Sequence, residues 1–183
     1  HLTLDGTPEF SRAEMERKYR NGGITAAFGK TKISYVEGCC VGGGSEINAG
    51  LYHRTPDAML ERWHSVYALD GASSDEMRPY FEANERDLSV SALQGPNPQA
   101  SLKMREGAAK MGWSSMEVPR WFKYAGPDDH IGKKQSMTRT FIPRALRAGA
   151  RLVTNTSVTR LSRDGKSWTL HCKDGQEIRC NTV

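Results

Sequence analysis

Three consecutive glycines, Gly42, Gly43 and Gly44, form the stretch of this sequence that is best suited to contact a ligand. Because glycine has no Cβ atom, it adopts positive φ readily and lets another molecule approach the main chain. Successive backbone N–H groups in such a stretch can form a concave site for an anion, for instance a phosphate. A tight structural turn would use the same freedom, so the glycines alone leave both interpretations open.

Side chains near the glycines carry groups that could take part in chemistry. Glu46 could change the charge next to a bound molecule, or it could be a solvated carboxylate near a helix start. Cys39 could place a thiol near a ligand, although a small buried residue is the commoner role of cysteine. His53 and His64 could act as bases near neutral pH. Histidines in or before a helix are more often structural or surface residues, so neither is assigned as a base.

A second glycine-rich stretch has the composition of a phosphate-binding loop but the wrong spacing. Five residues separate Gly23 from Gly29-Lys30-Thr31, one more than the phosphate-loop motif allows. The spacing determines which N–H groups converge on the phosphates, and no strand followed by a long helix surrounds this stretch. We therefore reject a phosphate loop here.

The four cysteines, Cys39, Cys40, Cys172 and Cys180, show no metal-binding pattern. Adjacent Cys39 and Cys40 cannot easily bond to each other, and no pair has the spacing of a zinc site. Reduced thiols are typical of the cytosol, so we expect a cytoplasmic protein without a metal. No apolar run is long enough to span a bilayer, so no transmembrane segment is expected.

The charge of the chain is moderate and mixed in sign. There are 26 basic and 21 acidic residues among 183, which gives a formal net charge of +5. The densest basic patches, at 133–134 and 144–151, are short. A nucleic-acid-binding surface would cluster positive charge on one face with aromatic residues, so we expect no nucleic-acid partner. Steep salt dependence of binding would be needed to support that alternative.

The patterns around the glycines predict two helices and two strands. Helices are expected over 12–20 and from Thr55-Pro56-Asp57 onward, and short strands over 24–28 and 32–36. Ser11 and Glu14 have the spacing of a capping box, and Pro56 suits the first position of a helix because its missing N–H costs nothing there. The second strand leads into the glycines. No regular helix is expected between the glycines and Thr55.

The remainder of the chain predicts further helices and a C-terminal set of strands. Helices are expected over 75–88, 101–111 and 140–148, and strands over 151–154, 157–162, 168–172 and 177–180. Ser74-Asp75-Glu76 is expected to cap the first of these helices. Residues 89–100 have loop composition, and residues 113–131 are expected to be irregular. Asp164-Gly165 and Asp174-Gly175 are hairpin signals, so the last three strands should form a β-meander.

Residues Gly38 to Arg54 resemble the first signature of the glucose-methanol-choline (GMC) flavin oxidoreductases. In that family a run of glycines followed by a small hydroxyl residue, an aliphatic residue and an Asn lies against FAD, between its pyrophosphate and isoalloxazine. The resemblance implies FAD contacts at Gly42, Gly43, Gly44, Ser45, Asn48, Ala49, Gly50 and Leu51, and an adenine contact at Val158.

Other stretches resemble the same family in matching order along the chain. Residues 75–82 are similar to its Leu-Pro-Tyr-Phe helix in the substrate-side region. Lys134-Gln135-Ser136 and the residues up to Ala145 resemble an element of the cholesterol-oxidase branch. Residues 151–161 look like the strand and meander approach where the family places a Val against the adenine.

The sequence departs from the family pattern at several positions. The fingerprint Gly-x-Gly-x-x-Gly after an N-terminal strand does not occur, and the catalytic histidine of the family would lie beyond Val183. Thr55 separates Arg54 from Pro56, which are adjacent in many members, and Ala49 replaces a frequent Gly. The chain thus resembles the middle of such an enzyme. We expect FAD binding by the chain alone to be weak or absent, and its uncovered edges to permit self-association.

The sequence as a whole predicts a mixed α+β fold: an incomplete FAD-binding domain with a C-terminal antiparallel β-meander, plus a helical substrate-side region. Residues 1–56 and 133–183 are assigned to the FAD-binding domain and residues 57–132 to the substrate side. The resemblance implies part of an FAD-dependent enzyme that oxidises a small-molecule alcohol by hydride transfer to the flavin, inactive in isolation. A family-derived binding or assembly domain without a cofactor is the alternative.

Overall fold

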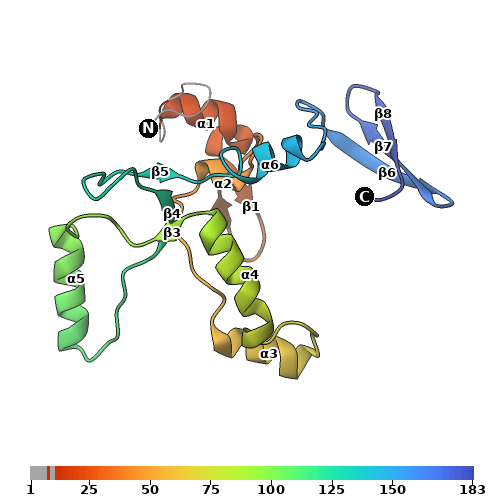
Figure 1. The fold of residues 1–183 in the computed structure, drawn as a ribbon. Coiled ribbons are helices and arrows are strands. Elements are labelled where there is room, and N and C mark those ends of the chain that lie inside the picture. Colours follow the sequence, from red (N-terminus) through yellow and green to blue (C-terminus); the bar gives the residue numbers. More distant parts are fainter. Residues whose placement is uncertain (1–7, 9–10) are drawn as a thin grey trace. The chain divides into compact units, whose positions relative to one another are not determined.

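The structure is a computed structural model that describes residue 8 and residues 11–183; residues 1–7 and 9–10, within the first predicted division, lie outside the described residues. It divides into two compact units, His1–Arg144 and Ala145–Val183, each considered by itself (Figure 1). The first unit contains α1 (Arg12–Lys18), η1 (Arg20–Gly23), β1 (Thr25–Ala27), β2 (Ile33–Tyr35), α2 (Gly44–Ile47), α3 (Asp57–Tyr67), α4 (Ser74–Asp87), β3 (Val90–Ser91), α5 (Gln99–Lys110), β4 (Arg120–Lys123), β5 (Lys133–Lys134) and most of α6 (Phe141–Arg147). This mixture of helices and antiparallel sheets confirms the mixed α+β class.

Helix α1 begins where the sequence predicts, because Ser11 caps it. The Ser11 hydroxyl accepts a hydrogen bond from the Glu14 N–H at 3.1 Å, which satisfies a donor that the helix itself leaves unpaired. Glu14 and Lys18 are buried one turn apart and form an ion pair at 3.2 Å. The helix ends before the positive-φ residues Asn21 and Gly22. The two predicted strands follow as β1 and β2, and they pair antiparallel.

Helices α3 and α4 follow the prediction with small shifts at their starts. Pro56 caps α3 and lies just before its first residue rather than inside the helix. Ser73 caps α4, not Ser74: the Ser73 hydroxyl accepts from the Glu76 N–H, and the Glu76 carboxylate accepts from the Ser73 N–H at 3.2 Å. The expected capping by Ser74 is therefore wrong by one position. Ser74 instead donates to the Asp57 carboxylate at 2.7 Å, which ties the starts of α3 and α4 together.

A small antiparallel sheet, in the order β3-β4-β5, forms where loops were expected. Val90 pairs with Trp121 and Phe122 pairs with Lys134, so residues 89–100 and 113–131 are not wholly irregular. Strands of two to four residues are too short to show the alternating pattern by which strands are recognised. Trp121 is 9% exposed, so this aromatic residue belongs to the core.

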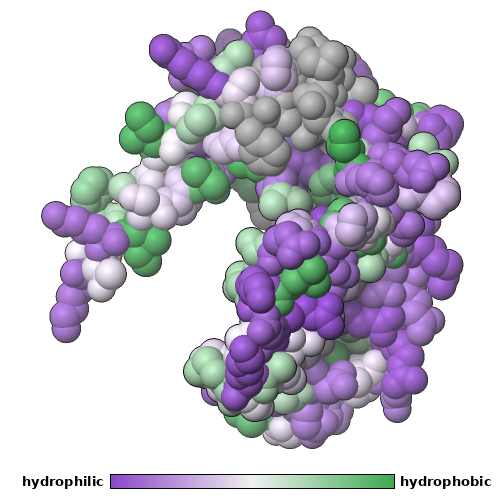
Figure 2. All heavy atoms as spheres, turned by 90° about the vertical axis from the view of Figure 1, so that its left-hand side faces the viewer, coloured by the Kyte–Doolittle hydropathy of each residue, from purple (hydrophilic) through white to green (hydrophobic). Residues whose placement is uncertain are grey.

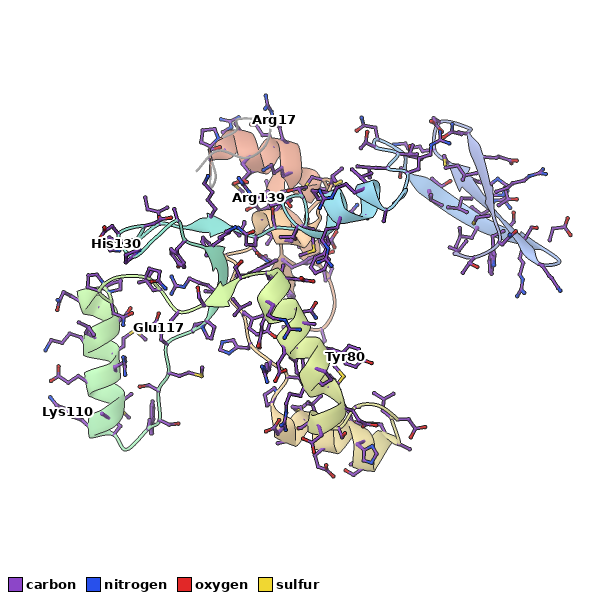
Figure 3. All side chains as sticks on the ribbon, viewed as in Figure 1. Arg17, Tyr80, Lys110, Glu117, His130 and Arg139 are labelled. Atoms are coloured by element: carbon purple, nitrogen blue, oxygen red, sulfur yellow. The ribbon has the colours of Figure 1, made fainter. Side chains whose placement is uncertain are left out.

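The two connections that flank α5 are joined to each other and to the sheet. The Glu117 carboxylate accepts from the Leu93 N–H at 2.7 Å and lies 3.4 Å from the Asn97 amide nitrogen. His130 Nδ1 lies 3.1 Å from the Gln94 carbonyl oxygen. Figure 3 labels Glu117 and His130 in the region between α5 and the sheet. These contacts hold the connections around residues 93–97 and 117 in place.

The second unit contains the predicted meander. Strands β6 (Val158–Asp164), β7 (Ser167–Cys172) and β8 (Glu177–Cys180) pair antiparallel in sequence order. Gly165 and Gly175 adopt positive φ at the two hairpins, as the Asp-Gly pairs predict. The strand expected over 151–154 is wrong: these residues are exposed and form no strand. A strand needs a neighbouring strand to bond to, and residues 151–154 pair with no described strand.

The buried apolar core is small. The buried apolar residues among those described are Leu60, Ala72, Leu88, Trp121 and Cys172. Large apolar side chains are exposed elsewhere; Ile24 and Phe28 are 84% and 83% exposed. Figure 2 shows such apolar residues, in green, among polar ones on the surface. No helix among the described residues combines the length and hydrophobicity required to cross a membrane.

The capping box of α4 gives a first testable prediction. Ser73→Ala removes the acceptor of the Glu76 N–H and should cost about 1 kcal/mol. Amides in the first turn of α4, such as that of Met77, which donates to the Ser73 carbonyl, should exchange with solvent about fivefold faster. Hydrogen exchange followed by NMR measures this directly.

Ser101→Ala is the matched control, because Ser101 is an exposed serine within α5; its effect should stay within about 0.5 kcal/mol. The bonds from Ser73 lower the pKa of Glu76. The protection of the first-turn amides from exchange that the Ser73–Glu76 bonds provide should therefore be present above the ordinary glutamate pKa. It should be lost as the pH falls through the lower pKa that Glu76 has in the folded protein. Equal exchange in both variants would contradict the assignment of Ser73 as the cap.

Candidate functional site

The chain reaches the glycines through contacts with the end of α1. The Cys39 N–H donates to the Lys18 carbonyl at 2.6 Å, and the Arg20 N–H donates to the Glu37 carbonyl at 2.9 Å. A β-bridge pairs Tyr19 with Gly38. We define the glycine segment as residues 38–51. Backbone bonds therefore hold its first two residues and the preceding Glu37.

Two glycines of this segment are required by the chain's own packing. A Cβ on Gly38 would lie 2.4 Å from the Gly43 carbonyl carbon, because the two backbones touch. Gly42 has a φ of +90°, and a Cβ there would lie 2.3 Å from the Glu46 carboxylate. Any side chain at either position would displace main chain or a hydrogen-bonded carboxylate. The turn interpretation therefore agrees with the packing of Gly42, and Gly38 is constrained in the same way although no turn was predicted for it.

Gly43 and Gly44 differ from them, since a Cβ on either would meet nothing within 4 Å. Gly43 has a φ of +56°, whereas Gly44 has no unusual φ and begins α2. The bare backbone at Gly43 and Gly44 therefore faces open space. It is the part of the segment that another molecule can approach at contact distance.

A short helix, α2, follows directly, although no regular helix was expected before Thr55. It forms because Ser45 and Glu46 find partners in residues 137–138. The Ser45 hydroxyl accepts from the Met137 N–H at 3.0 Å. The Glu46 carboxylate accepts from the Thr138 N–H at 3.2 Å and from the Thr138 hydroxyl at 2.9 Å. Glu46, which is half-buried, thus holds two segments together.

Lys134 holds the other end of α2. Its side chain is buried, and its ammonium donates to the Glu46 carbonyl at 2.8 Å and to the Asn48 carbonyl at 2.9 Å. These carbonyls lie at the C-terminal end of the helix, where backbone acceptors lack partners and a cation is favourable. No local pattern indicates this contact, because 88 residues separate Lys134 from Glu46.

Residues 48–51 are fixed against β4. The Asn48 side chain accepts from the Gly50 N–H at 3.1 Å, and the Gly50 carbonyl accepts from the Trp121 N–H at 2.9 Å. Gly50 is buried with a φ of +69°, and a Cβ would lie 2.6 Å from the Phe122 ring. Ala49 and Leu51 are exposed. Gly50 is therefore a third position, after Gly38 and Gly42, at which a close contact requires glycine.

The first unit therefore brings together the residues predicted from 42 to 51. Val158 begins β6 in the second unit, opposite Cys172 and 44% exposed. Cys39 is exposed, so its interpretation as a small buried residue is wrong; the Lys18 carbonyl holds its backbone at the surface. His53 and His64 are exposed as well.

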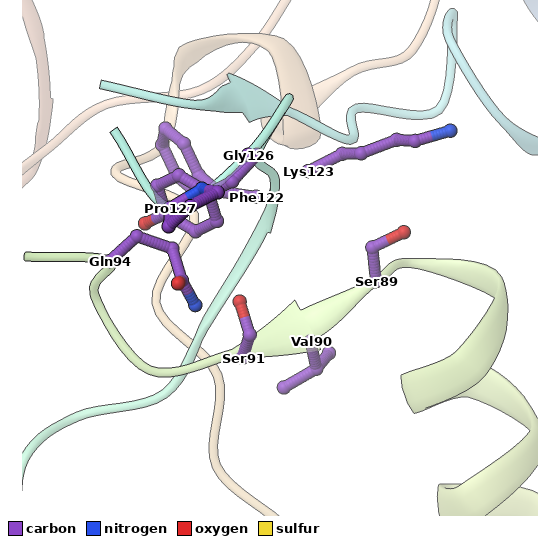
Figure 4. Close-up of a pocket in the computed structure, with 9 residues that line it drawn as sticks. Ser89, Val90, Ser91, Gln94, Phe122, Lys123, Gly126 and Pro127 are labelled. Carbon is purple, nitrogen blue, oxygen red and sulfur yellow. The ribbon is translucent and has the colours of Figure 1, made fainter. Parts of the chain in front are cut away.

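Two of the cavities near the sheet are relevant to the site. The one in Figure 4 has a volume of about 500 Å³ and is lined by residues that include Ser91, Gln94 and Lys123. The other has a volume of about 610 Å³ and adjoins the end of the glycine segment at Tyr52. Sequence patterns could not indicate either cavity, because β3 and the residues before β4 were expected to be irregular.

An ion pair lies at the second cavity. The Arg54 guanidinium donates two hydrogen bonds to the Glu85 carboxylate, at 2.6 and 2.7 Å. This pairing lowers the pKa of Glu85. Burial, assisted by the neighbouring Glu85 carboxylate, raises the pKa of Tyr52. Tyr52 therefore stays protonated at neutral pH.

Among the described residues, no cluster of His, Cys, Asp and Glu is arranged to hold a metal ion.

The contact of Lys134 with α2 gives a second prediction. Lys134→Met leaves the carbonyls of Glu46 and Asn48 without this donor, which should cost about 2 kcal/mol in the free energy of unfolding. Urea denaturation measures that cost, and amide chemical shifts of residues 45–50 should change. Lys133→Met, at an exposed neighbour in the same strand, should change stability by less than about 0.5 kcal/mol. Equal stability of the two variants would contradict the role of Lys134.

Comparison with known proteins identifies the family. The model of the GMC oxidoreductase family matches residues 15–183. An uncharacterized GMC-type oxidoreductase of Sinorhizobium fredii is 32% identical over 88% of this chain and 33% of its own length. No solved structure matches the chain.

More distant relatives include a long-chain-alcohol oxidase of Arabidopsis thaliana, 24% identical over 93% of this chain and 23% of its own length. An oxygen-dependent choline dehydrogenase of Staphylococcus saprophyticus is 24% identical over 82% of this chain and 31% of its own length. The chain thus spans about a third or less of these relatives. On the family match and the 32% identity, the chain belongs to the GMC oxidoreductase family, whose N-terminal domain binds FAD.

Proposed function

We propose that this chain forms one wall of the FAD site of an oxidoreductase that oxidises an alcohol. The observation that carries the proposal is the open backbone at Gly43 and Gly44, within a segment that is otherwise held by hydrogen bonds on both sides. A large flat ligand needs such a bare and fixed surface. The names of the relatives, alcohol oxidase and choline dehydrogenase, support an alcohol as substrate.

The residues predicted to bind FAD divide into two roles in this proposal. Gly43, Gly44, Ala49 and Leu51 are open or exposed and would contact the cofactor. The others already have partners inside the chain and would hold that surface in place: Gly42, Ser45, Asn48 and Gly50. Val158 is exposed and stays the proposed adenine contact. The residues of this chain that are proposed to contact or support the cofactor therefore fit FAD.

Bound FAD would supply the acceptor for the hydride that leaves the alcohol carbon. The chain's own contribution is to fix the backbone that faces the cofactor. Neither of the exposed histidines His53 and His64 is assigned as the base. We propose that the catalytic groups come from other parts of an enzyme of the relatives' length.

The finer assignments are proposals as well. The element Lys134-Gln135-Ser136 supports a cholesterol-oxidase-like branch, and its contact with α2 gives it a physical role. We propose that residues 57–132 form the substrate side, that residues 1–56 and 133–183 belong to the FAD-binding domain, and that the protein is cytoplasmic.

A pair of glycine substitutions tests the proposed FAD wall. Gly44→Ala fits the backbone, since Gly44 is helical and a Cβ there meets nothing. The fold should therefore be unchanged, while the added methyl would press on the cofactor. The affinity of the FAD-binding protein that contains this chain should fall about tenfold, as overpacking of about 1–3 kcal/mol implies. Titration of flavin fluorescence measures the change.

Gly107→Ala is the control, because Gly107 is also helical with open space around it but lies in α5. It should stabilise the protein by up to about 1 kcal/mol and leave FAD affinity unchanged. If Gly44→Ala and Gly107→Ala bind FAD equally well, the assignment of Gly43 and Gly44 to the cofactor wall is wrong.

The isolated chain should bind FAD weakly or not at all and should self-associate. One wall alone cannot enclose the cofactor, and apolar side chains such as Ile24 and Phe28 are exposed, which favours association. Sedimentation of the chain mixed with FAD, detected by protein and by flavin absorbance, tests both points. The protein boundary should move faster as concentration rises, and the flavin should not move with it. A monomer carrying stoichiometric flavin would refute the proposal.

A further inference from the structure

The sheet of β6, β7 and β8 (Figure 1) has one apolar face and one polar face. Residues that stand opposite each other in antiparallel strands project to the same side, as do residues two apart along one strand. Leu161, Leu170 and Ile178 are matched across the three strands and form the apolar face. The residues that alternate with them form the polar face: Arg160, Ser162, Thr169, His171, Glu177 and Arg179.

A histidine of the polar face contacts a serine on one side and a carboxylate on the other. His171 Nε2 lies 2.8 Å from the Ser162 hydroxyl oxygen. His171 Nδ1 lies 2.9 Å from a Glu177 carboxylate oxygen. The register explains both contacts, because His171 stands directly opposite Glu177 and diagonally across from Ser162. The pairing of the strands therefore holds the three groups in a row, one from each strand.

The carboxylate determines which ring nitrogen of His171 carries the proton. An ionised carboxylate can only accept a hydrogen bond, so the proton lies on Nδ1 and is donated to Glu177. A neutral imidazole with its proton on Nδ1 can only accept at Nε2. The Ser162 hydroxyl therefore donates to His171 Nε2.

This arrangement is the one that activates a serine as a nucleophile. A base within hydrogen-bond reach of the hydroxyl, itself oriented by a third group, is the geometric signature of serine nucleophiles, and it recurs on unrelated folds. Here His171 is the base, and Glu177 is a positioning residue that orients its ring. The side chains of His171 and Glu177 are 21% and 52% exposed. Water and a small molecule can therefore reach these groups.

Two arginines add positive charge to the same face. Arg160 stands opposite His171, and Arg179 stands opposite Thr169. Both arginines are exposed. A cation close to a reacting carbonyl group stabilises the negative charge that develops on its oxygen. The charge of this face therefore favours attack on a carbonyl carbon.

We propose that Ser162, His171 and Glu177 form a site that hydrolyses esters. The Ser162 oxygen bonds to the carbonyl carbon of the ester while its proton passes to His171 Nε2. The bond from that carbon to the alcohol oxygen then breaks, and His171 gives the proton to the leaving alcohol. Water, activated in the same way, splits the acyl-serine into a carboxylic acid and free Ser162. A small acyl group suits the site, because an open sheet face encloses little of a ligand.

Reaction of the chain with p-nitrophenyl acetate, stopped with acid, tests the proposal. Release of p-nitrophenol gives the rate, and mass spectrometry of peptides locates the acetyl group. Ser162 should be acetylated at least about a hundredfold faster than Ser167, since a positioned base contributes about that much. Ser167 is the matched control, because it is an exposed serine on the same face of the sheet. This comparison is made within one protein, so it needs no variant to fold.

Variants separate the roles of the other two groups. His171→Gln should slow acetylation of Ser162 about a hundredfold, and Ser167→Ala should leave it unchanged. Glu177→Gln should slow it at least about tenfold. It should also move the ring proton of His171 partly from Nδ1 to Nε2, which the ¹⁵N chemical shifts of the ring report. Equal acetylation of Ser162 and Ser167, or unchanged acetylation of Ser162 in His171→Gln, would overturn the proposal.

Discussion

The hydrogen bonds from the buried ammonium of Lys134 to the carbonyls of Glu46 and Asn48 fix the position on which the site depends. The glycine segment has little regular structure of its own, since α2 spans only Gly44–Ile47. A single helical turn is not stable in isolation. Residues 134–138 supply what the turn lacks: an ammonium at its C-terminal end, and hydrogen bonds with Ser45 and Glu46 at its start. A segment rich in glycine thereby acquires a fixed backbone.

This fixed backbone explains why the glycines of one motif have different roles. Gly38, Gly42 and Gly50 are required because main chain, a carboxylate and an aromatic ring occupy the space of their side chains. Gly43 and Gly44 leave that space open. Packing at Gly38, Gly42 and Gly50 restricts the backbone, which lowers the entropy that a binding event would cost, and the open glycines leave room beside it. The combination gives a bare surface that is held in position, and Tyr52 continues from it into the adjacent cavity.

Local patterns predicted most of the elements, and long-range pairings account for what they missed. Helices α1, α3 and α4 and the β6–β8 meander have caps, periodicity or Asp-Gly turns that can be recognised within a few residues. The sheet of β3, β4 and β5 depends on pairs such as Val90 with Trp121, which no local pattern reveals. The strand expected over 151–154 had suitable residues but no described strand to pair with.

The same distinction applies to the site. The predicted set from Gly42 to Leu51 is brought together in one unit, because it is contiguous in sequence. The roles of its members could not be predicted, since they depend on Lys134, Thr138 and Trp121, which lie far away in the chain. Glu46 is the clearest case: its type suggested electrostatics, and its contacts make it a bridge between segments.

The most direct test is an experimental structure, with FAD bound, of a protein that includes this chain. The account predicts FAD atoms within about 4 Å of the Gly43 and Gly44 backbone, with Glu46 and Lys134 in the contacts described above and directed away from the cofactor. A structure in which FAD touches no residue between Gly42 and Leu51 would contradict it.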